Sequence, residues 1–462
     1  MKLKMKLQNP ETRMNGRRAK ASVLIIVLWV TIGLVSIALY FANSMNYELR
    51  AADNRVNGLS AEQAIEGAAR YVAYALQLYA TNGAMPDNTQ FKCEAVPVGD
   101  AKFWLIGRDP NEGNSTEPYF GLVDEGGKLN LNNVSTNVFQ YLPNMTADFA
   151  GAIMDWRGTN GVVSLDYTAL GYVPKNAPFE TVDELRLVYG ATEDLLAGED
   201  LNRNGVLDAN EKDLNNNGEL DPGLLEYVTV YTREPNFHAD GTTLTNVNTA
   251  TLTQIQALFQ YAGTSSATRM AQSIYNSIHP NPRNPRIVNN CNGLLDFCLR
   301  CKNAGMSSGD FANLSATVTT STNTYFRGRV NVNIASPDVL TALIMGANVD
   351  EQTAVSAAQT LVSYRQQNPD SLGSIAWVID ALGNNSPVVT ALARGNFVTT
   401  RSYQFTADIA AVGSFGRGYR RVKFIFDVSD GTPKILYRQD LSRLGWALGE
   451  KARENLVAKD TP

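Results

Sequence analysis

Oxygen-bearing side chains recur at alternate positions in the acidic segment 200–226, and this spacing favours binding of a hard metal ion. A first twelve-residue loop runs from Asp200 to Glu211, with Gly205 at the sixth position, where a calcium loop must turn sharply. A second loop starts at Asp213, thirteen residues later, and Gly218 repeats the glycine. Calcium takes about six to eight oxygen ligands, and clustered carboxylates repel one another without it. We therefore predict one or two structural calcium ions in this segment.

The predicted calcium ligands are carboxylates, side-chain amides and backbone carbonyls. They are Asp200, Asn202, Asn204, Val206, Asp208 and Glu211 in the first loop, and Asp213, Asn215, Asn217, Glu219 and Asp221 in the second. Leu224 occupies the twelfth position of the second loop, so a bidentate carboxylate must come from Glu226 or from a distant residue. The amides lower the ligand charge, which predicts dissociation constants of ~0.1–1 mM. A solvated acidic turn is the alternative, but two in-register copies favour calcium, and magnesium is disfavoured because it prefers a small octahedral shell.

Composition makes catalysis and nucleic-acid binding the weaker hypotheses. The 462 residues include two histidines, His238 and His279, which do not readily supply a catalytic triad, a multi-histidine zinc site or a haem ligand set. The whole chain has a net charge of −5, and residues 1–21 carry +6, so residues 22–462 hold −11. An acidic body is a poor partner for a phosphate backbone. We therefore expect a protein that is not an enzyme and does not bind nucleic acid.

Four cysteines follow the N-terminal region: Cys93, Cys291, Cys298 and Cys301. In an oxidising compartment they favour disulfides, with three connectivities open. Cys298 and Cys301 also have the spacing of half a zinc site or of a redox pair. Zinc would need four convergent ligands, and a redox motif would need a thioredoxin-like context that the sequence does not show. Disulfides are the favoured prediction.

The N-terminal region contains an uncharged apolar run of 21 residues, 22–42. At ~1.5 Å per residue such a helix spans about 31 Å, enough for a ~30 Å hydrocarbon core. A cleaved secretory signal is the alternative, but its apolar region is normally only ~7–15 residues long. Residues 43–80 continue without proline and carry two apolar stripes that are out of phase near 58–63. We predict one helix of about 60 residues that starts in the membrane and ends packed on a soluble domain.

A repeat lies in the large middle region. Residues 127–135 (GKLNLNNVS) are echoed 201 residues later by 328–336 (GRVNVNIAS), and each copy leads into an apolar helical pattern. Ser135 and Ser336 have the residue type of helix N-caps. The pattern predicts two helical modules, which resemble helix-hairpin-helix units, but the acidic charge favours a scaffold over DNA binding.

The C-terminal region changes to an alternating pattern of apolar and polar residues. Three runs, 403–409, 421–428 and 434–438, are separated by turn residues and predict antiparallel strands. Further strands are expected at 103–107 and 119–124. Together with the long helix they predict an α+β fold.

A basic leader, a small residue, an uncharged helix and an amphipathic continuation together resemble the type IV pilin family. In this resemblance the prepilin peptidase cuts between Ala21 and Ser22, with Ala21 where the family prefers glycine. Ile26 stands at the fifth mature position, where the family usually carries glutamate. The ordered motifs GKLNLNN, AIMDWRG, PFETVDELRLVYG and VNVNIASPDVLTALI are similar to the K-type minor pseudopilin family of type II secretion, which also lacks that glutamate.

The resemblance covers residues 22 to about 446 and implies a pilin-like fold, in which a long N-terminal helix packs on an antiparallel sheet, with a large α-helical insertion. The implied segments are a basic leader (1–21), a transmembrane half-helix (22–42), an amphipathic helix and first strands (43–125), the helical insertion (126–400), C-terminal strands (401–446) and a flexible tail (447–462).

The resemblance also implies a place in the cell and partners. The chain would be a single-pass protein of a Gram-negative inner membrane with its bulk in the periplasm. It would help to initiate a pseudopilus and form its tip with I- and J-type minor pseudopilins. Prepilin peptidase, the inner-membrane assembly platform and secreted proteins are further expected partners. The alternative is a membrane-anchored, calcium-binding adhesin or receptor-like protein outside any filament.

Overall fold

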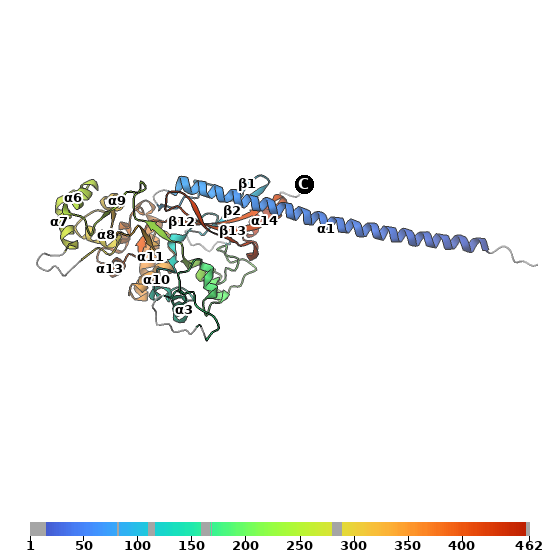
Figure 1. Ribbon diagram of the computed structural model, residues 1–462, viewed down its shortest axis with the longest axis horizontal. Coiled ribbons are helices and arrows are strands. Elements are labelled where there is room, and N and C mark those ends of the chain that lie inside the picture. Colours follow the sequence, from blue (N-terminus) through green and yellow to red (C-terminus); the bar gives the residue numbers. More distant parts are fainter. Residues whose placement is uncertain are drawn as a thin grey trace, which may run out of the picture.

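A computed structural model describes residues 15–80, 83–109, 116–158, 167, 169–279 and 289–458. These residues form one long helix, an antiparallel sheet and a large helical insertion (Figure 1), which confirms the predicted α+β pilin-like class. Residues 1–14 of the predicted leader lie outside the described residues. The predicted cleavage residues Ala21 and Ser22 are described only as part of the helical backbone.

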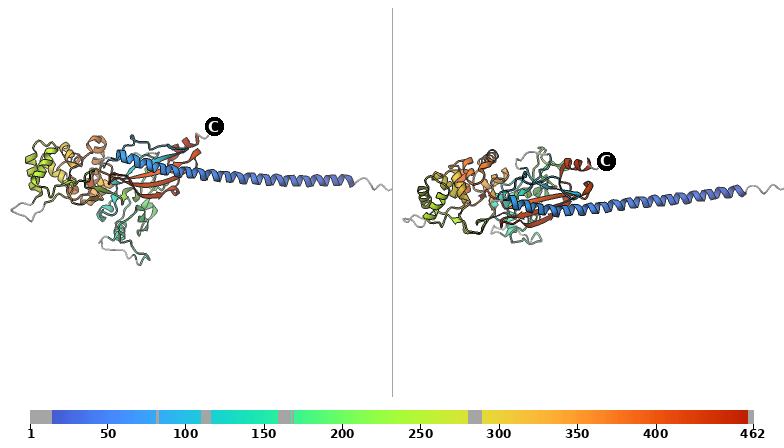
Figure 2. Two further views of the ribbon diagram at one scale, coloured as in Figure 1. Left: turned by 45° about the horizontal axis from the view of Figure 1, so that its top comes forward. Right: turned by 90° about the horizontal axis from the view of Figure 1, so that it is seen from above.

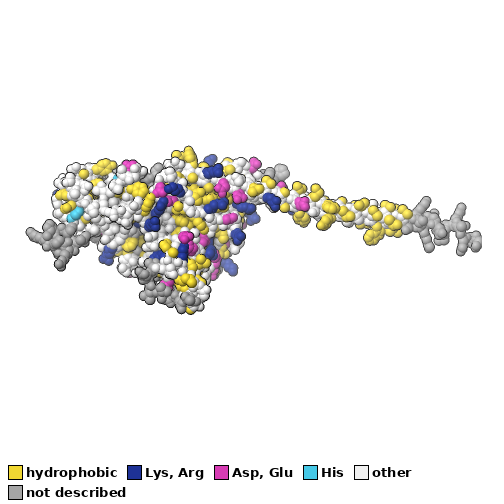
Figure 3. Space-filling view, viewed as in Figure 1, with side chains coloured by type: hydrophobic (Ala, Val, Ile, Leu, Met, Phe, Trp, Pro, Cys, Tyr) yellow, Lys and Arg dark blue, Asp and Glu magenta, His cyan; other side chains and the backbone are white. Residues whose placement is uncertain are grey.

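The N-terminal helix α1 (Asn15–Tyr79) has 65 residues, and its described part is long and apolar enough to cross a membrane. The large apolar side chains from Val23 to Leu59 are exposed, and they cover the projecting part of the helix in Figure 3. Beyond Leu59, residues such as Ile65 and Val72 are buried against the sheet. The two out-of-phase stripes therefore have different surroundings, and the helix runs through both.

The sheet has the strand order β1-β2-β12-β13-β14, with β3 paired to β12, and all of its pairs are antiparallel. Its strands are β1 (Val96–Val98), β2 (Ala101–Ile106), β3 (Val123–Asp124), β12 (Gln404–Val412), β13 (Arg420–Asp427) and β14 (Lys434–Asp440). The C-terminal part of α1 lies along this sheet (Figure 2), and its small residues Ala61, Ala64 and Ala68 permit a close approach.

The insertion leaves the sheet at β3 and returns at β12. Because β3 pairs with β12, both ends of the insertion lie at one place in the sheet. The sheet can therefore form around the insertion without a break in its central strands. In Figure 1 the insertion extends beyond the end of α1 and to one side of the sheet.

Three parallel strand pairs close three successive modules in the insertion, where the repeat predicted two. The pairs are β4 (Leu129–Asn130) with β5 (Val228–Thr229), β7 (Thr245–Asn246) with β8 (Val318–Thr319), and β10 (Val330–Asn331) with β11 (Val398–Thr399). Every closing strand is Val-Thr, and every opening strand ends in Asn. The middle copy begins Thr245-Asn246-Val247-Asn248, which retains both asparagines but lacks the preceding glycine.

The modules differ in their helices. The first holds α2 (Thr136–Phe139), α3 (Ala147–Arg157), η3 (Val182–Leu187), α4 (Glu193–Leu196) and α5 (Leu224–Tyr227). The second holds α6 (Leu252–Tyr261), α7 (Ala267–Ile278), α8 (Leu294–Asn303) and α9 (Ser308–Ser315). The third holds α10 (Pro337–Gly346), α11 (Glu351–Gln367), η4 (Pro369–Ser371), α12 (Ala376–Leu382) and α13 (Pro387–Ala393). Outside them lie η2 (Glu125–Gly127), β6 (Arg233–Pro235), β9 (Tyr325–Arg327), η5 (Ser414–Gly416) and η6 (Ser442–Leu444).

The same asparagine turn opens each module. The Oδ1 atoms of Asn130, Asn246 and Asn331 accept the backbone N–H two residues later, at 2.9, 3.0 and 3.0 Å. Ser336 then caps α10 as predicted by accepting the N–H of Val339, whereas Ser135 occupies the N-cap of α2 without a side-chain bond.

The C-terminal stretch differs from the predicted flexible tail. Residues 449–458 form α14 (Gly449–Ala458). Ala447 and Leu448 are fully buried on the sheet face opposite α1, where they pack with Trp104 and Ile106. The sequence pattern predicted a flexible tail because residues 450–454 are mostly charged, and the two buried residues before them form too short an apolar pattern to be recognised.

Asp124 gives the fold a pH dependence. Burial raises the pKa of its carboxyl to about 7, although the N–H of Gly126 and the side chain of Ser402 favour the charged form. A folded-state pKa above the unfolded value means that stability is full at low pH and is lost as pH rises through about 7. We expect the free energy of unfolding to fall by about 1 kcal/mol between about pH 6 and pH 8. Asp124→Asn should flatten this slope in denaturant titrations; an unchanged slope would exclude Asp124 as its source.

Candidate cation-binding loops and the charged junction beside them

The first predicted loop has the backbone path that a cation site needs. The carboxylate of Asp200 accepts the N–H groups of Asn204 and Gly205, both at 2.9 Å, and Oδ1 of Asn204 accepts the N–H of Val206 at 3.0 Å. Gly205 has a φ of +83° and Arg203 a φ of +58°, so the chain turns through the left-handed region twice. These bonds fix the side chains of Asp200 and Asn204 within the loop.

The second loop repeats this path at every corresponding position. Asp213 accepts the N–H groups of Asn217 and Gly218, at 3.2 and 2.8 Å, and Asn217 accepts the N–H of Glu219 at 2.8 Å. Gly218 and Asn216 have φ values of +77° and +57°. Two loops with the same internal bonds follow from the same spacing of Asp, Asn and Gly in the sequence.

Glu199 occupies the place of the missing carboxylate in the second loop. In the first loop Glu211 accepts the N–H groups of Asn202 and Asp208, at 3.0 and 3.1 Å. In the second loop Glu199 accepts the N–H groups of Leu214 and Asp221, at 2.6 and 3.0 Å; Asp221 corresponds to Asp208, and Leu214 lies one position earlier in its loop than Asn202 does.

The chain brings Glu199 there through a short antiparallel bridge between Gly198 and Pro222. Glu226 is not available, because Arg108 binds both of its oxygens at 2.9 Å. The missing carboxylate therefore comes from before the first loop and not from after the second.

The donor set of the first loop fits calcium. It consists of oxygens alone, which suits a hard cation. Oδ1 of the buried Asn202 has no hydrogen-bond partner, and the amide N–H groups of Asn202 and Asn204 both donate to Asp208. A half-turn of the Asn202 amide would place its oxygen where its nitrogen now lies, whereas Oδ1 of Asn204 is held by the N–H of Val206.

The two loops differ in burial. Asp200, Asn202, Asn204 and Val206 are buried, whereas Asn215, Asn217 and Glu219 are exposed. Within the described residues no group of three or more His, Cys, Asp or Glu side chains is placed to hold a metal, so each loop depends on its amide and carbonyl oxygens. Calcium binding remains a prediction for both loops.

Arg421 joins the first loop to the sheet. It is fully buried on β13 and binds both oxygens of Asp408 on β12, at 2.8 and 2.6 Å. Its other N–H groups donate to the backbone carbonyls of Asn202 and Arg203, the latter at 2.8 Å. The amide of Asn202 also donates to the carbonyl of Trp446 at 3.3 Å. The first loop is thus held by the sheet and by the C-terminal segment, and neither connection was visible in the sequence.

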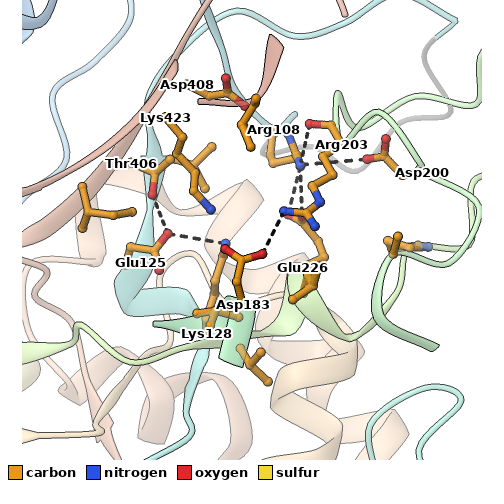
Figure 4. Close-up of a pocket in the computed structure, with 18 of the residues that line it drawn as sticks. Arg108, Glu125, Lys128, Asp183, Asp200, Arg203, Glu226, Thr406, Asp408 and Lys423 are labelled. Atoms are coloured by element: carbon orange, nitrogen blue, oxygen red, sulfur yellow. Dashed lines mark hydrogen bonds and ion pairs between the residues drawn. The ribbon is translucent and has the colours of Figure 1, made fainter. Parts of the chain in front are cut away.

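A charged junction lies where the first loop, η2, η3 and the sheet meet (Figure 4). Arg108, which follows β2, binds Glu226 and lies 3.9 Å from Asp200. Lys128 lies 3.5 Å from Glu125, and Arg203 lies 3.7 Å from Asp183. These side chains surround a cavity of about 80 Å³ that also contacts Lys423.

The four cysteines are buried free thiols, so the predicted disulfides are absent from the described residues. Cys93 belongs to the core between α1 and the sheet, whereas Cys291, Cys298 and Cys301 belong to the core of the insertion. Cys93 therefore has no cysteine in its own core. Burial raises the pKa of the Cys93 and Cys291 thiols to about 12 each, which keeps the free thiols protonated at neutral pH.

The architecture defines a class of protein: an α+β domain carried on a long, partly apolar N-terminal helix. No family model matches the chain, and no curated protein matches it. Among solved structures, it is similar to a chain in the crystal structure of the GspK-GspI-GspJ complex from the enterotoxigenic Escherichia coli type 2 secretion system. The identity is 13%, the match covers 45% of this chain and 78% of that chain, and the TM-score is 0.17, too low to bear on fold or function.

Proposed function

We propose that the chain is a non-enzymatic minor pseudopilin of a type II protein secretion system. It forms the tip of the periplasmic pseudopilus with I- and J-type minor pseudopilins and helps to initiate assembly. The observation that carries this proposal is the division of α1 into an exposed apolar part and a part packed on the sheet. A helix that served only as an anchor would need no apolar surface outside the bilayer.

The apolar surface of α1 extends beyond the predicted membrane segment. Met45, Tyr47, Leu49, Val56 and Leu59 are all more than half exposed, although they follow residue 42. Exposed apolar patches of this kind mark protein–protein contacts. Helices of neighbouring pilin-like subunits supply a matching surface.

Ile26 supports a place at the tip. A fifth-position glutamate in pilin-like filaments is thought to pair with the terminal amine of an adjacent subunit, which offsets the cost of both charges in the bilayer. A subunit with Ile26 can offer its own amine at Ser22 but no carboxylate. Assembly is then one-sided, as expected for the first subunit. The insertion, which extends to one side of the sheet in Figure 1, would also crowd the wall of a thin filament.

Structural calcium ions belong to this proposal as supports of the 200–221 segment. Within it, Val206 is the one buried apolar residue, so apolar packing alone provides little to hold the two loops. A cation would compensate the converging carboxylates and fix the first loop against Arg421 and the sheet.

N-terminal sequencing of the protein purified from its native membrane tests the processing step. A mature chain that starts at Ser22 is the expected result, because the resemblance places the prepilin peptidase cut before it. Replacing Ala21 by a bulky residue should leave the leader attached, whereas Ala42→Leu should not. An intact Met1 in the assembled protein would favour the membrane-anchored adhesin instead.

A further inference from the structure

The cavity at the charged junction is lined by cationic side chains whose N–H groups are not used as hydrogen-bond donors. Among the described residues, the side chains of Lys128, Arg203 and Lys423 donate no hydrogen bond, although all three line it. Their nearest partners are the ion pairs at 3.5 Å from Lys128 to Glu125 and at 3.7 Å from Arg203 to Asp183. Nε of Arg203 is buried without a partner. Burying such donor groups is costly unless an acceptor atom forms hydrogen bonds with them.

Figure 4 shows that these three cationic groups come from different parts of the fold and point toward the same space. Lys423 projects from β13, Lys128 follows η2, and Arg203 belongs to the first cation loop. Lys128 and Arg203 keep 16% and 15% of their side-chain surface exposed, so the cavity communicates with solvent. A volume of about 80 Å³ exceeds the ~10–15 Å³ that one water requires and accommodates a small polar group.

The charges around the cavity balance one another. Arg108 pairs with Glu226, and Arg421 pairs with Asp408. The remaining cations are Lys128, Arg203 and Lys423, and the remaining carboxylates are Glu125, Asp183 and Asp200, so three positive charges face three negative ones. A singly charged group with two acceptor oxygens therefore adds less uncompensated charge to the cavity than a doubly charged phosphate would.

We propose that the cavity between η2, η3, the first cation loop and β13 binds a carboxylate group, with Lys423, Lys128 and Arg203 as its donors. The carboxylate belongs either to a small free acid or to an acidic side chain of a protein segment. Both offer the same two oxygens to the same donors, and the experiment below distinguishes them. The cavity adjoins the first cation loop, because Asp200 also lines it, and the Arg203 side chain points toward the junction (Figure 4).

Of the three donors, Lys423 is the one whose presence is hardest to explain by a contribution to stability. Burial lowers the pKa of its ammonium, and Asp183 and Glu125 offset this only in part. Lys423 is half-buried, and a cation partly withdrawn from water without hydrogen bonds opposes folding. Lys423→Met keeps most of the side-chain volume and removes the charge. We therefore expect the variant to have a thermal midpoint at least equal to that of the wild type when no carboxylate is added.

The test is a titration of the full-length protein in detergent with ¹³C-labelled acetate, followed by NMR at constant ionic strength, pH and calcium. The wild type should show a saturable component that unlabelled acetate displaces and that chloride does not. Lys423→Met should weaken acetate binding by about tenfold or more, since charge-assisted hydrogen bonds are lost. Lys434→Met, on the exposed strand β14, removes the same charge elsewhere and should bind acetate like the wild type.

Arg203→Asn is a second variant, because asparagine tolerates the left-handed backbone at this position. It should weaken acetate binding even if Lys423→Met does not fold. A glutamate-containing peptide with blocked ends separates the two sources: tighter binding than acetate identifies a protein segment, and binding of acetate alone identifies a small acid. Absence of a saturable component in the wild type, or equal binding by the folded Lys423→Met variant, would overturn the proposal.

Discussion

Replacing Arg421 by methionine is expected to destabilise the protein by about 3–5 kcal/mol. The change leaves the buried carboxylate of Asp408 without its cation and two carbonyls of the first loop without their donor. Breaking one side of a buried pair costs more than the pair contributes, because a charge remains in a poorly solvated place. Denaturant titration of the full-length protein, monitored by tryptophan fluorescence, measures the loss.

Two variants separate this effect from a general loss of charge. Arg438 lies on β14 of the same sheet, and Arg438→Met breaks its exposed ion pair with Glu66 on α1, which should cost no more than about 1 kcal/mol. The double variant Arg421→Met and Asp408→Asn removes the uncompensated charge and should regain part of the lost stability. A cost below about 1 kcal/mol for Arg421→Met alone would contradict the role assigned to this residue.

Millimolar calcium is expected to raise the thermal midpoint of the wild type, and chelation should reverse the change. Ligand that binds only the folded state stabilises it by mass action, by about 1.4–2.7 kcal/mol at 10 to 100 times the dissociation constant. Asp200→Ala removes the first ligand of the first loop and should suppress most of this response. The effect should be largest for the first loop, because that loop is buried and bound to Arg421.

Matched variants in the two loops test the assignment of ligands. Asp208→Ala and Asp221→Ala change the same position in the first and the second loop. Glu211→Gln and Glu199→Gln change the two carboxylates that occupy equivalent places. Asp240→Ala is a control, because Asp240 lies in an exposed turn outside both loops. Isothermal titration of each variant should show loss of calcium binding by the loop that carries the change and not by the other loop. If calcium changes neither the melting curve nor the titration curve of the wild type, the metal prediction is refuted.

The sequence was sufficient for features that depend on local spacing. The length and hydropathy of residues 22–80 define α1, and the alternation after residue 403 defines β12, β13 and β14. The spacing of Asp, Asn and Gly in the two loops fixes the same internal bonds twice. Each of these signals lies within a short stretch of chain, where propensity and periodicity act directly.

Features that join distant parts of the chain could not be predicted in the same way. Glu199 reaches the second loop through the bridge from Gly198 to Pro222, and Arg421 reaches the first loop from a strand more than 200 residues away in sequence. The middle module was missed because its opening strand begins with Thr245 and lacks the glycine of the other two copies. Disulfides were predicted only from the expected oxidising compartment. In the structure Cys93 lies in one core and the other three cysteines in another.

Photo-crosslinking from Val56 tests the proposed place in a pseudopilus most directly. Val56 is 65% exposed on α1, beyond the predicted membrane segment and before the part that packs on the sheet. A photoreactive residue there should crosslink to other minor pilin-like subunits in the native membrane. A photoreactive residue at the exposed Tyr261, on α6 of the second module, should not. We expect crosslinks to partners of the I and J types and none between copies of this chain. Repeated self-crosslinks along a filament shaft, or no pilin-like partner at all, would contradict the proposed place in a pseudopilus.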